Sequence, residues 1–208
     1  MHYRREVRAL RVYFPATALF DPSRAIAPGR TARPESAAAW SLLLWALRRD
    51  FGAQTLPGIA VNAAGKPYFP AEPGLRFSLS HTRGCVLCAL SDTGEVGADV
   101  QVISPKDEPF AARLMSGRER ADFTLHELWC LREAVYKLTG SGSLRSMPFR
   151  REGGRIVSPF DGVECRLYGG IPGCEAGVAA FPPEPLPDRI EEVGVRELQK
   201  GIVITPGS

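Results

Sequence analysis

Apolar residues recur three and four positions apart between residues 34 and 51, which predicts an amphipathic helix. Its apolar face consists of Trp40, Leu43, Leu44, Leu47 and Phe51. Pro34 and Glu35 suit the first turn of a helix, and Gly52 suits the position that ends it. Upstream, residues 7–14 alternate between apolar and polar side chains, which predicts a strand.

The middle of the chain alternates with a period of two, which is typical of strands with one apolar face. In residues 75–80 (LRFSLS), Ser78 and Ser80 lie on the face opposite the apolar side chains. In residues 95–102 (EVGADVQV), Asp99 lies on the face opposite the valines. The apolar segment CVLCALS lies between these two, and the three segments together predict an antiparallel meander of three strands.

The second half of the chain begins with helical sequence. Two capping boxes, each a hydroxyl residue followed three positions later by glutamate, mark helix starts at Ser116 and Thr124. We expect the second helix to end near Lys137. Short strands are predicted around residues 162–168, 174–181 and 189–194. This order of elements predicts an α+β fold of two similar halves that join near residues 103–109, although the halves share no strong sequence repeat.

Composition and charge narrow the class of protein. The 208 residues, 44% hydrophobic and 24% charged, are ordinary for a soluble globular protein with one large or two small domains. No apolar run approaches the roughly 20 residues of a membrane helix, and none follows the charged N-terminus as in a secretory signal. A net charge of +3 lacks the dense basic stripe of nucleic-acid-binding proteins. We therefore expect a cytoplasmic protein that binds neither membranes nor nucleic acid.

The five cysteines are scattered and odd in number, which argues against a disulfide framework. Cys85 and Cys88 form a C-x-x-C pair in an apolar segment. Residues three apart on a strand point to opposite faces, so the two thiols are poorly placed to share a metal ion. We interpret both as core residues.

Two short segments carry candidate acid groups. Asp99 lies on a strand beside Gly97, where the missing side chain lets another element approach the backbone. On the predicted helix, Trp129, Glu133 and Lys137 are four residues apart and share one face. Taken alone, Asp99 is better explained as a surface aspartate. The helical stripe alone is equally compatible with an ordinary Glu–Lys pair.

Two further segments carry groups that suit phosphate. Ser80 and His81 end a strand, but adjacent strand residues point apart and no G-x-S-x-G elbow is present, which disfavours a hydrolase. A hydroxyl, a backbone N–H and an imidazole suit phosphate binding better. Lys66 lies on a loop fixed by Pro67. Both segments remain compatible with plain surface turns.

In order along the chain stand N-x-x-GKPYF, FSLSHT, VGADV and W-x-x-R-E-A-x-x-K, over about residues 36–140. This ordered set resembles the 4′-phosphopantetheinyl transferases, in particular the larger surfactin-synthetase type. The resemblance implies a pseudo-two-fold pair of similar α/β halves, residues 1–104 and 105–208, with coenzyme A in the cleft between them. It implies transfer of phosphopantetheine from coenzyme A to a serine of an acyl or peptidyl carrier protein, with Mg²⁺ and release of 3′,5′-ADP.

The resemblance also implies roles for individual residues. Asp99 and Glu133 match magnesium ligands, and Glu133 or a water that it orients is the expected base for the carrier serine. Lys137 matches the lysine near the reacting phosphate. Three residues match positions that hold the phosphates of the coenzyme: Lys66, Ser80 and His81. Glu119 matches an acid that is either a catalytic group or only a member of its capping box, and we leave both readings open.

Two positions depart from the family pattern. Gln101 stands where the family has a third acid, and it could still offer a neutral oxygen to the metal. Arg132 replaces the usual lysine before Glu133, which predicts an altered phosphate geometry because arginine is a planar fork. The arginines expected to bind the 3′-phosphate are Arg24, Arg30 and Arg33. The alternative to an active, monomeric enzyme is a catalytically impaired protein of the same fold that still binds coenzyme A.

Overall fold

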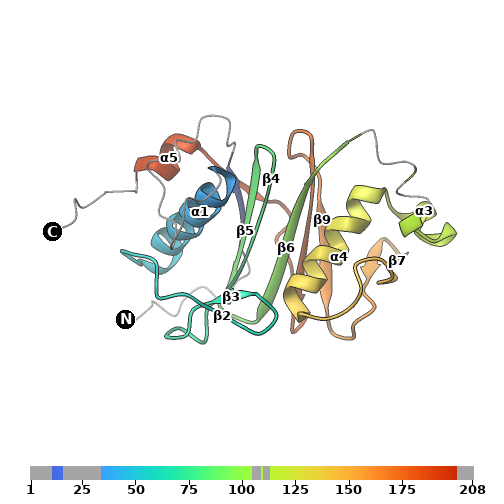
Figure 1. Cartoon of the computed structure of the whole chain (residues 1–208), viewed down its shortest axis with the longest axis horizontal. Helices are drawn as coiled ribbons and strands as arrows, with labels where there is room; N and C mark the ends of the chain where they lie inside the picture. The colour runs from blue at the N-terminus through green and yellow to red at the C-terminus, as the bar shows by residue number, and fades with distance from the viewer. Residues whose placement is uncertain (1–10, 16–33, 105–108, 110–112, 201–208) are drawn as a thin grey trace.

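The computed structural model describes residues 11–15, 34–104, 109 and 113–200. In this part of the chain, two main sheets lie back to back, and one long helix covers the outer face of each (Figure 1). The first sheet has the strand order β11-β1-β5-β4, and the second has the order β6-β10-β9. The protein is thus a mixed α+β fold, as the sequence predicted.

The bounds of the elements are as follows. The first sheet contains β1 (Arg11–Pro15), β4 (Arg76–Thr82), β5 (Cys85–Ser91) and β11 (Glu191–Val193). The second contains β6 (Glu95–Val102), β9 (Glu164–Tyr168) and β10 (Cys174–Phe181). Two small hairpins pair β2 (Ala60–Val61) with β3 (Pro67–Tyr68) and β7 (Arg150–Glu152) with β8 (Arg155–Val157). The helices are α1 (Pro34–Phe51), α3 (Gly117–Asp122), α4 (Leu125–Thr139) and α5 (Val195–Lys200).

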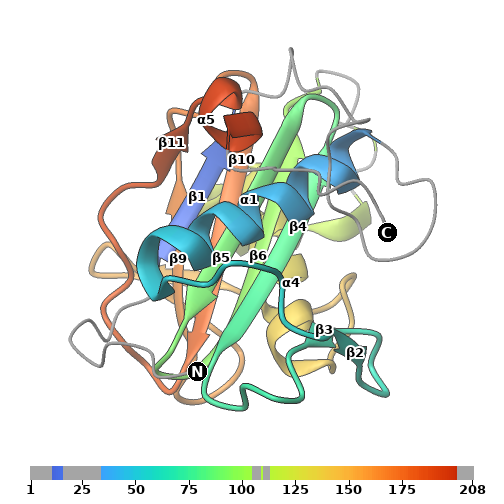
Figure 2. The same cartoon turned by 90° about the vertical axis from the view of Figure 1, so that its left-hand side faces the viewer.

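Both long helices form where local signals predicted them. Helix α1 spans the predicted residues, and Gly52 follows it with a φ of 67°. Helix α4 starts with the capping box of Thr124 and Glu127, and it ends at Gly140 in the left-handed conformation that glycine adopts without strain. Figure 2 looks onto α1, which lies over β5 and β4. The three predicted strands of the second half correspond to β9, β10 and β11.

The predicted meander is wrong in its third strand. Strands β4 and β5 form the expected antiparallel hairpin, but β6 leaves them and pairs with β10 of the second sheet. Conversely, β11 near the C-terminus pairs with β1 near the N-terminus. Each sheet therefore contains strands from both halves of the chain. The predicted junction at 103–109 and the strand at 7–14 fall partly outside the described residues.

The alternating strand pattern places the main core between the sheets. Val96, Ala98 and Val100 of β6 pack there with Leu87 and Ala89 of β5. Because neighbouring strand residues point apart, the opposite face of β6 carries its polar residues toward α4. The region between the second sheet and α4 is therefore where the polar face of β6 is covered.

The cysteines only partly follow the prediction. Cys85 packs in the core between the sheets and Cys88 packs under α1, so the two thiols do point to opposite faces. However, a disulfide joins Cys85 to Cys174 of β10 and links the two sheets, which the scattered cysteine pattern did not predict. Cys130 and Cys165 are buried free thiols. No helix among the described residues combines the length and the apolar character that crossing a lipid bilayer would require.

Candidate functional site

The site is built around Asp99, which points from β6 toward α4 and is only 2% exposed. Its Oδ1 atom accepts hydrogen bonds from Ser80 Oγ at 2.7 Å and from Lys137 Nζ at 2.6 Å. Its Oδ2 atom accepts one from Gln101 Nε2 at 2.8 Å. A buried carboxylate is costly unless it is paired, and here donors from three elements satisfy it.

Two glycines let α4 lie directly on the sheet. A Cβ atom on Gly97 would overlap the carbonyl oxygen of Ala134, and it would lie 2.8 Å from the backbone nitrogen of Leu138. A Cβ atom on Gly177, the partner of Asp99 on β10, would lie 3.0 Å from the carbonyl carbon of Cys130. The prediction that another element approaches the backbone at Gly97 is confirmed, and that element is α4.

This close packing brings Glu133 beside Asp99. Glu133 is partly buried, and burial followed by the negative charge of Asp99 raises the pKa of its carboxyl, while Lys137 opposes the shift. The two carboxylates are therefore near enough for one charge to act on the other. That the two acids share one metal ion stays a prediction.

The edge of β6 that faces β4 is satisfied by side chains rather than by a neighbouring strand. The amides of Ala98 and Val100 donate to the hydroxyls of Ser78 and Ser80 at 2.9 and 3.2 Å. The carbonyl oxygen of Ala98 accepts from Lys137 Nζ at 3.2 Å. These contacts explain why the polar face of β4 is buried, because its two serines bind the main chain of β6 in the other sheet.

The carbonyl oxygen of Val96, at the same edge, accepts from Lys66 Nζ at 2.9 Å. Lys66 Nζ also donates to Glu95 Oε2 at 2.7 Å, and Arg76 binds the same carboxylate. Lys66 is therefore anchored at the start of β6. It lines two neighbouring cavities, of about 330 and 280 Å³.

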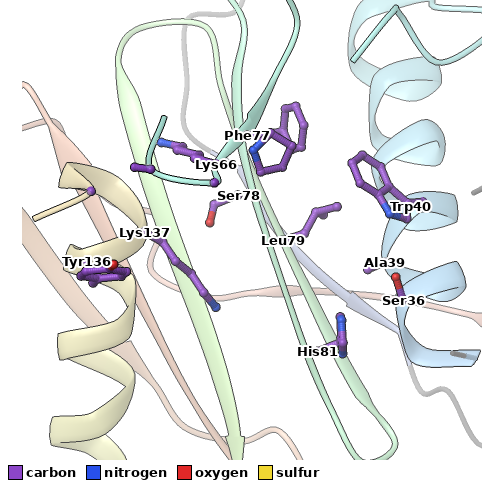
Figure 3. A pocket seen from close by; sticks show the side chains of 14 residues that line it. Ser36, Ala39, Trp40, Lys66, Phe77, Ser78, Leu79, His81, Tyr136 and Lys137 are labelled. Atoms are coloured by element: carbon purple, nitrogen blue, oxygen red, sulfur yellow. The ribbon is translucent and has the colours of Figure 1, made fainter. Parts of the chain in front are cut away.

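The larger cavity, of about 330 Å³, is shown in Figure 3. It adjoins the Asp99 cluster, because Lys137 lines the cavity and also binds Asp99. Its walls come from α1, the loop before β3, β4 and the end of α4. Lys66, His81 and Lys137 contribute to it, and Figure 3 shows the Lys137 side chain extending from α4 toward β4. The apolar walls include Trp40 and Phe77. The cavity thus combines three basic side chains with aromatic surface.

Ser80 lies beneath this cavity rather than in its lining. Its hydroxyl donates to Asp99 and accepts from Val100 N and from Lys137 Nζ, at 3.1 Å for the lysine. One hydroxyl has one donor and two acceptor positions, so these three contacts use them all. Ser80 can bind a phosphate only by giving one of them up.

Arg132 corrects a prediction. We expected it to alter the geometry of a phosphate site, but it is only 2% exposed and points into the core. Its guanidinium donates to the carbonyl oxygens of Met147 and Leu114 and to Glu119 Oε1, at 2.8–2.9 Å. The buried guanidinium of Arg132 thus joins α4 to the segments around it. A planar group with several N–H donors suits this role.

Glu119 is occupied by the same core. Its Oε2 atom accepts from the amide of Ser116 in the capping box, and its Oε1 atom accepts from Arg132 and from the amide of Phe149. Of the two readings left open, these contacts support the capping residue. Arg24, Arg30 and Arg33 lie outside the described residues.

The oxygen donors at Asp99 fit a small hard cation. Among the described residues, no three His, Cys, Asp or Glu side chains are grouped to hold a metal ion. The charge of Asp99 acts on the carboxyl of Glu133, and Gln101 binds Asp99 through its amide nitrogen. Magnesium is commonly held by one or two carboxylates together with substrate phosphates, so this donor set fits it.

Comparisons with known proteins agree on one family, although no family model matches the chain. A 4′-phosphopantetheinyl transferase of Bacillus subtilis is 30% identical over 39% of this chain and 41% of that protein. The 4′-phosphopantetheinyl transferase AcpT of Escherichia coli K12 is 34% identical over 42% of this chain and 51% of its own length. The transferase Sfp of Bacillus subtilis strain 168 is 29% identical over 64% of this chain and 67% of its own length. The chain is similar to 4′-phosphopantetheinyl transferases over part of its length.

The chain spans about half the length of the curated relatives that it matches, between 41% and 52% for four of them. The similarity therefore covers part of each relative, and the activity and partners of the whole protein do not follow from the match alone. Sequence reasoning missed two aromatic residues that line the 330 Å³ cavity, Trp40 and Tyr136. Trp40 was assigned to the apolar face of α1, and Tyr136 adjoins Lys137, which was the available signal.

Proposed function

We propose that this protein transfers the 4′-phosphopantetheine group of coenzyme A to a serine of an acyl or peptidyl carrier protein, with Mg²⁺, releasing 3′,5′-ADP. One observation carries the proposal: the buried Asp99, whose charge acts on the partly buried Glu133, is bound by Lys137, which lines a cavity together with Lys66 and His81. We further propose that the two helix-covered sheets form the pseudo-two-fold fold of the family, with coenzyme A between them, and that the protein acts as a cytoplasmic monomer.

In this proposal each side chain has a stated task. Asp99, Glu133 and the amide oxygen of Gln101 would hold magnesium, which supplies positive charge to the diphosphate of the coenzyme. Lys137, Lys66 and His81 bind phosphate oxygens and stabilise the charge that develops there. The apolar cavity wall around Trp40 excludes water from the bound coenzyme.

Glu133 is the proposed base. The hydroxyl oxygen of the carrier serine forms a bond to the β-phosphorus, and the bond from that phosphorus to the bridging oxygen breaks. The serine proton passes to Glu133, directly or through a water molecule, and the electron pair leaves with 3′,5′-ADP. A raised carboxyl pKa suits this task, because a base with a higher pKa accepts a proton more readily. Glu119 takes no part here, since its oxygens are engaged in the core.

The test is transfer of a fluorescent coenzyme A derivative to a purified acyl carrier protein. Asp99→Ala and Glu133→Ala should each lower the rate about 100-fold or more, because each removes charge at the reacting phosphate. Glu164→Ala, at an exposed glutamate on β9, is the matched control and should keep the rate. Near-normal turnover of either site variant at saturating magnesium would contradict the metal assignment.

The alternative is a catalytically impaired protein that binds coenzyme A. One observation favours it: Gln101 places an amide against Asp99 where the family has a third acid. Coenzyme A binding measured by calorimetry, combined with no labelling of any carrier, would support this alternative over transfer.

A further inference from the structure

The two lysines of the cavity differ in what holds their ammonium groups. Lys66 is bound to Glu95 and to the carbonyl oxygen of Val96, away from Asp99. Lys137 makes three contacts, with Asp99 Oδ1 at 2.6 Å, Ser80 Oγ at 3.1 Å and the carbonyl oxygen of Ala98 at 3.2 Å. An ammonium group has three N–H donors, so these three contacts use all the donors of Lys137.

These contacts leave Asp99 with little capacity for a cation. Ser80 and Lys137 fill both acceptor positions of its Oδ1 atom, and Gln101 takes one of the two on Oδ2. A divalent ion on the remaining position would lie close to the ammonium of Lys137 and be repelled by it. Because the Asp99 side chain is only 3% exposed, water does little to screen that repulsion.

Lys137 is able to leave. Its side chain is 28% exposed, it stands in the last turn of α4, and it lines the cavity in which we propose that the coenzyme phosphates bind. Its four-carbon stem is flexible and ends in a compact charge. A phosphate in the cavity offers the ammonium new acceptors within reach of the same side chain.

We propose that Lys137 and a divalent cation compete for Asp99, and that a phosphate in the cavity draws Lys137 away, so that the cation and coenzyme A bind cooperatively. This inference rests on the proposed function, because it assumes that the cavity takes the coenzyme. The coupling is reciprocal, so each ligand tightens the other by the same factor, and such factors are typically about 5 to 150.

The experiment measures Mn²⁺ affinity by the electron paramagnetic resonance signal of the free ion, in protein first stripped of divalent ions. In the wild-type protein, saturating coenzyme A should tighten Mn²⁺ binding about fivefold or more. In Lys137→Met, Mn²⁺ alone should bind at least about fivefold more tightly than to the wild type, and the effect of coenzyme A should shrink accordingly. Arg150→Met removes an equal charge outside the site, on β7, where Arg150 binds Glu152, so its affinity for Mn²⁺ alone should match that of the wild type.

Thermal unfolding gives a second measurement that also reports on folding. Lys137→Met leaves Asp99 without its counter-ion, so saturating Mn²⁺ should raise its melting temperature more than that of the wild type. Lys137→Gln, which keeps a polar group, replaces it if the methionine variant does not fold. Equal Mn²⁺ affinity of the wild type and the position-137 variant would overturn the competition.

The outcomes separate this inference from the proposed function. If the wild type labels a carrier protein but shows no coupling between Mn²⁺ and coenzyme A, the competition is wrong and the transferase proposal stands. If the wild type neither labels a carrier nor binds Mn²⁺ with coenzyme A present, both are overturned.

Discussion

The two helix-covered faces of this protein are built alike and packed differently. Under α1, large side chains fill the space, among them Leu43, Leu47, Phe77 and Leu90. Under α4, Gly97 and Gly177 let the helix backbone approach the sheet, and the polar side of β6 lies in the contact. The comparison teaches that bulk under a helix serves stability, whereas removing bulk brings charged groups from two elements together.

The strongest test of this difference in packing is to add one methyl group under α4. Gly97→Ala would overlap Ala134 and force α4 off the sheet, so we expect a loss of more than about 4 kcal/mol in unfolding free energy, or no folded protein. Under α1, Leu47→Ala should cost about 2–5 kcal/mol and leave turnover per folded molecule unchanged. Urea unfolding and the transfer assay measure both. A stable and active Gly97→Ala protein would show that α4 does not depend on this approach.

A smaller effect tests the polar side of β6. Gln101→Glu restores an acid beside Asp99, and the added charge should lower the magnesium concentration for half-maximal transfer about tenfold, equivalent to about 1.4 kcal/mol. Gln54→Glu makes the same chemical change at an exposed position before β2 and serves as the control. A magnesium titration that is unchanged in Gln101→Glu would place residue 101 outside the metal's ligands.

The smallest expected effect is on pH dependence. At Glu133, the transfer rate and the stability should change with pH in opposite directions. Burial and Asp99 raise the pKa of Glu133, so transfer should fall with decreasing pH at a higher pH than an ordinary glutamate would give. The stability contribution has the opposite trend. A carboxyl with a raised folded-state pKa is favourable at low pH, and this contribution is lost as pH rises through that pKa.

Glu133→Gln should therefore abolish the acidic limb of the transfer profile while slightly raising the melting temperature at pH 7. Profiles of initial rate and of melting temperature between pH 4.5 and 8, for the wild type and the variant, provide the measurement. If the melting temperature of the variant is lower than that of the wild type at every pH, the interaction with Asp99 is not unfavourable and the stated shift is wrong.

Local signals predicted the elements of this fold well. The ends of α1 and α4 follow from Gly52, the capping box at Thr124 and Gly140, because capping depends on residues a few positions apart. The partner of β6 did not follow. Alternation shows which side chains share a face, but it does not choose between β4 and β10 as a neighbour, because that depends on packing distant in sequence.

The site was predicted as far as the face on which each residue stands. Lys137 binds Asp99, and Glu133 lies on the same side of α4 as Lys137, because a period of two and a period of 3.6 place these residues on facing sides of β6 and α4. The orientation of Arg132 was not predicted. Arg132 precedes Glu133 in the sequence, and successive residues of a helix point about 100° apart. The Arg132 side chain therefore points into the core, where it binds Glu119.

The side chains that bond to the edge of β6 belong to the same sequence motifs that resemble the transferase family. Ser78, Ser80, Lys66 and Lys137 replace a missing strand, so removing any one of them exposes a main-chain group of an edge strand. A descendant that had lost its chemistry would still need these four residues to keep its sheets in register. Motif matching alone therefore detects the scaffold, and we expect the carboxylates of Asp99 and Glu133 to be the positions that distinguish an active enzyme from an inactive relative.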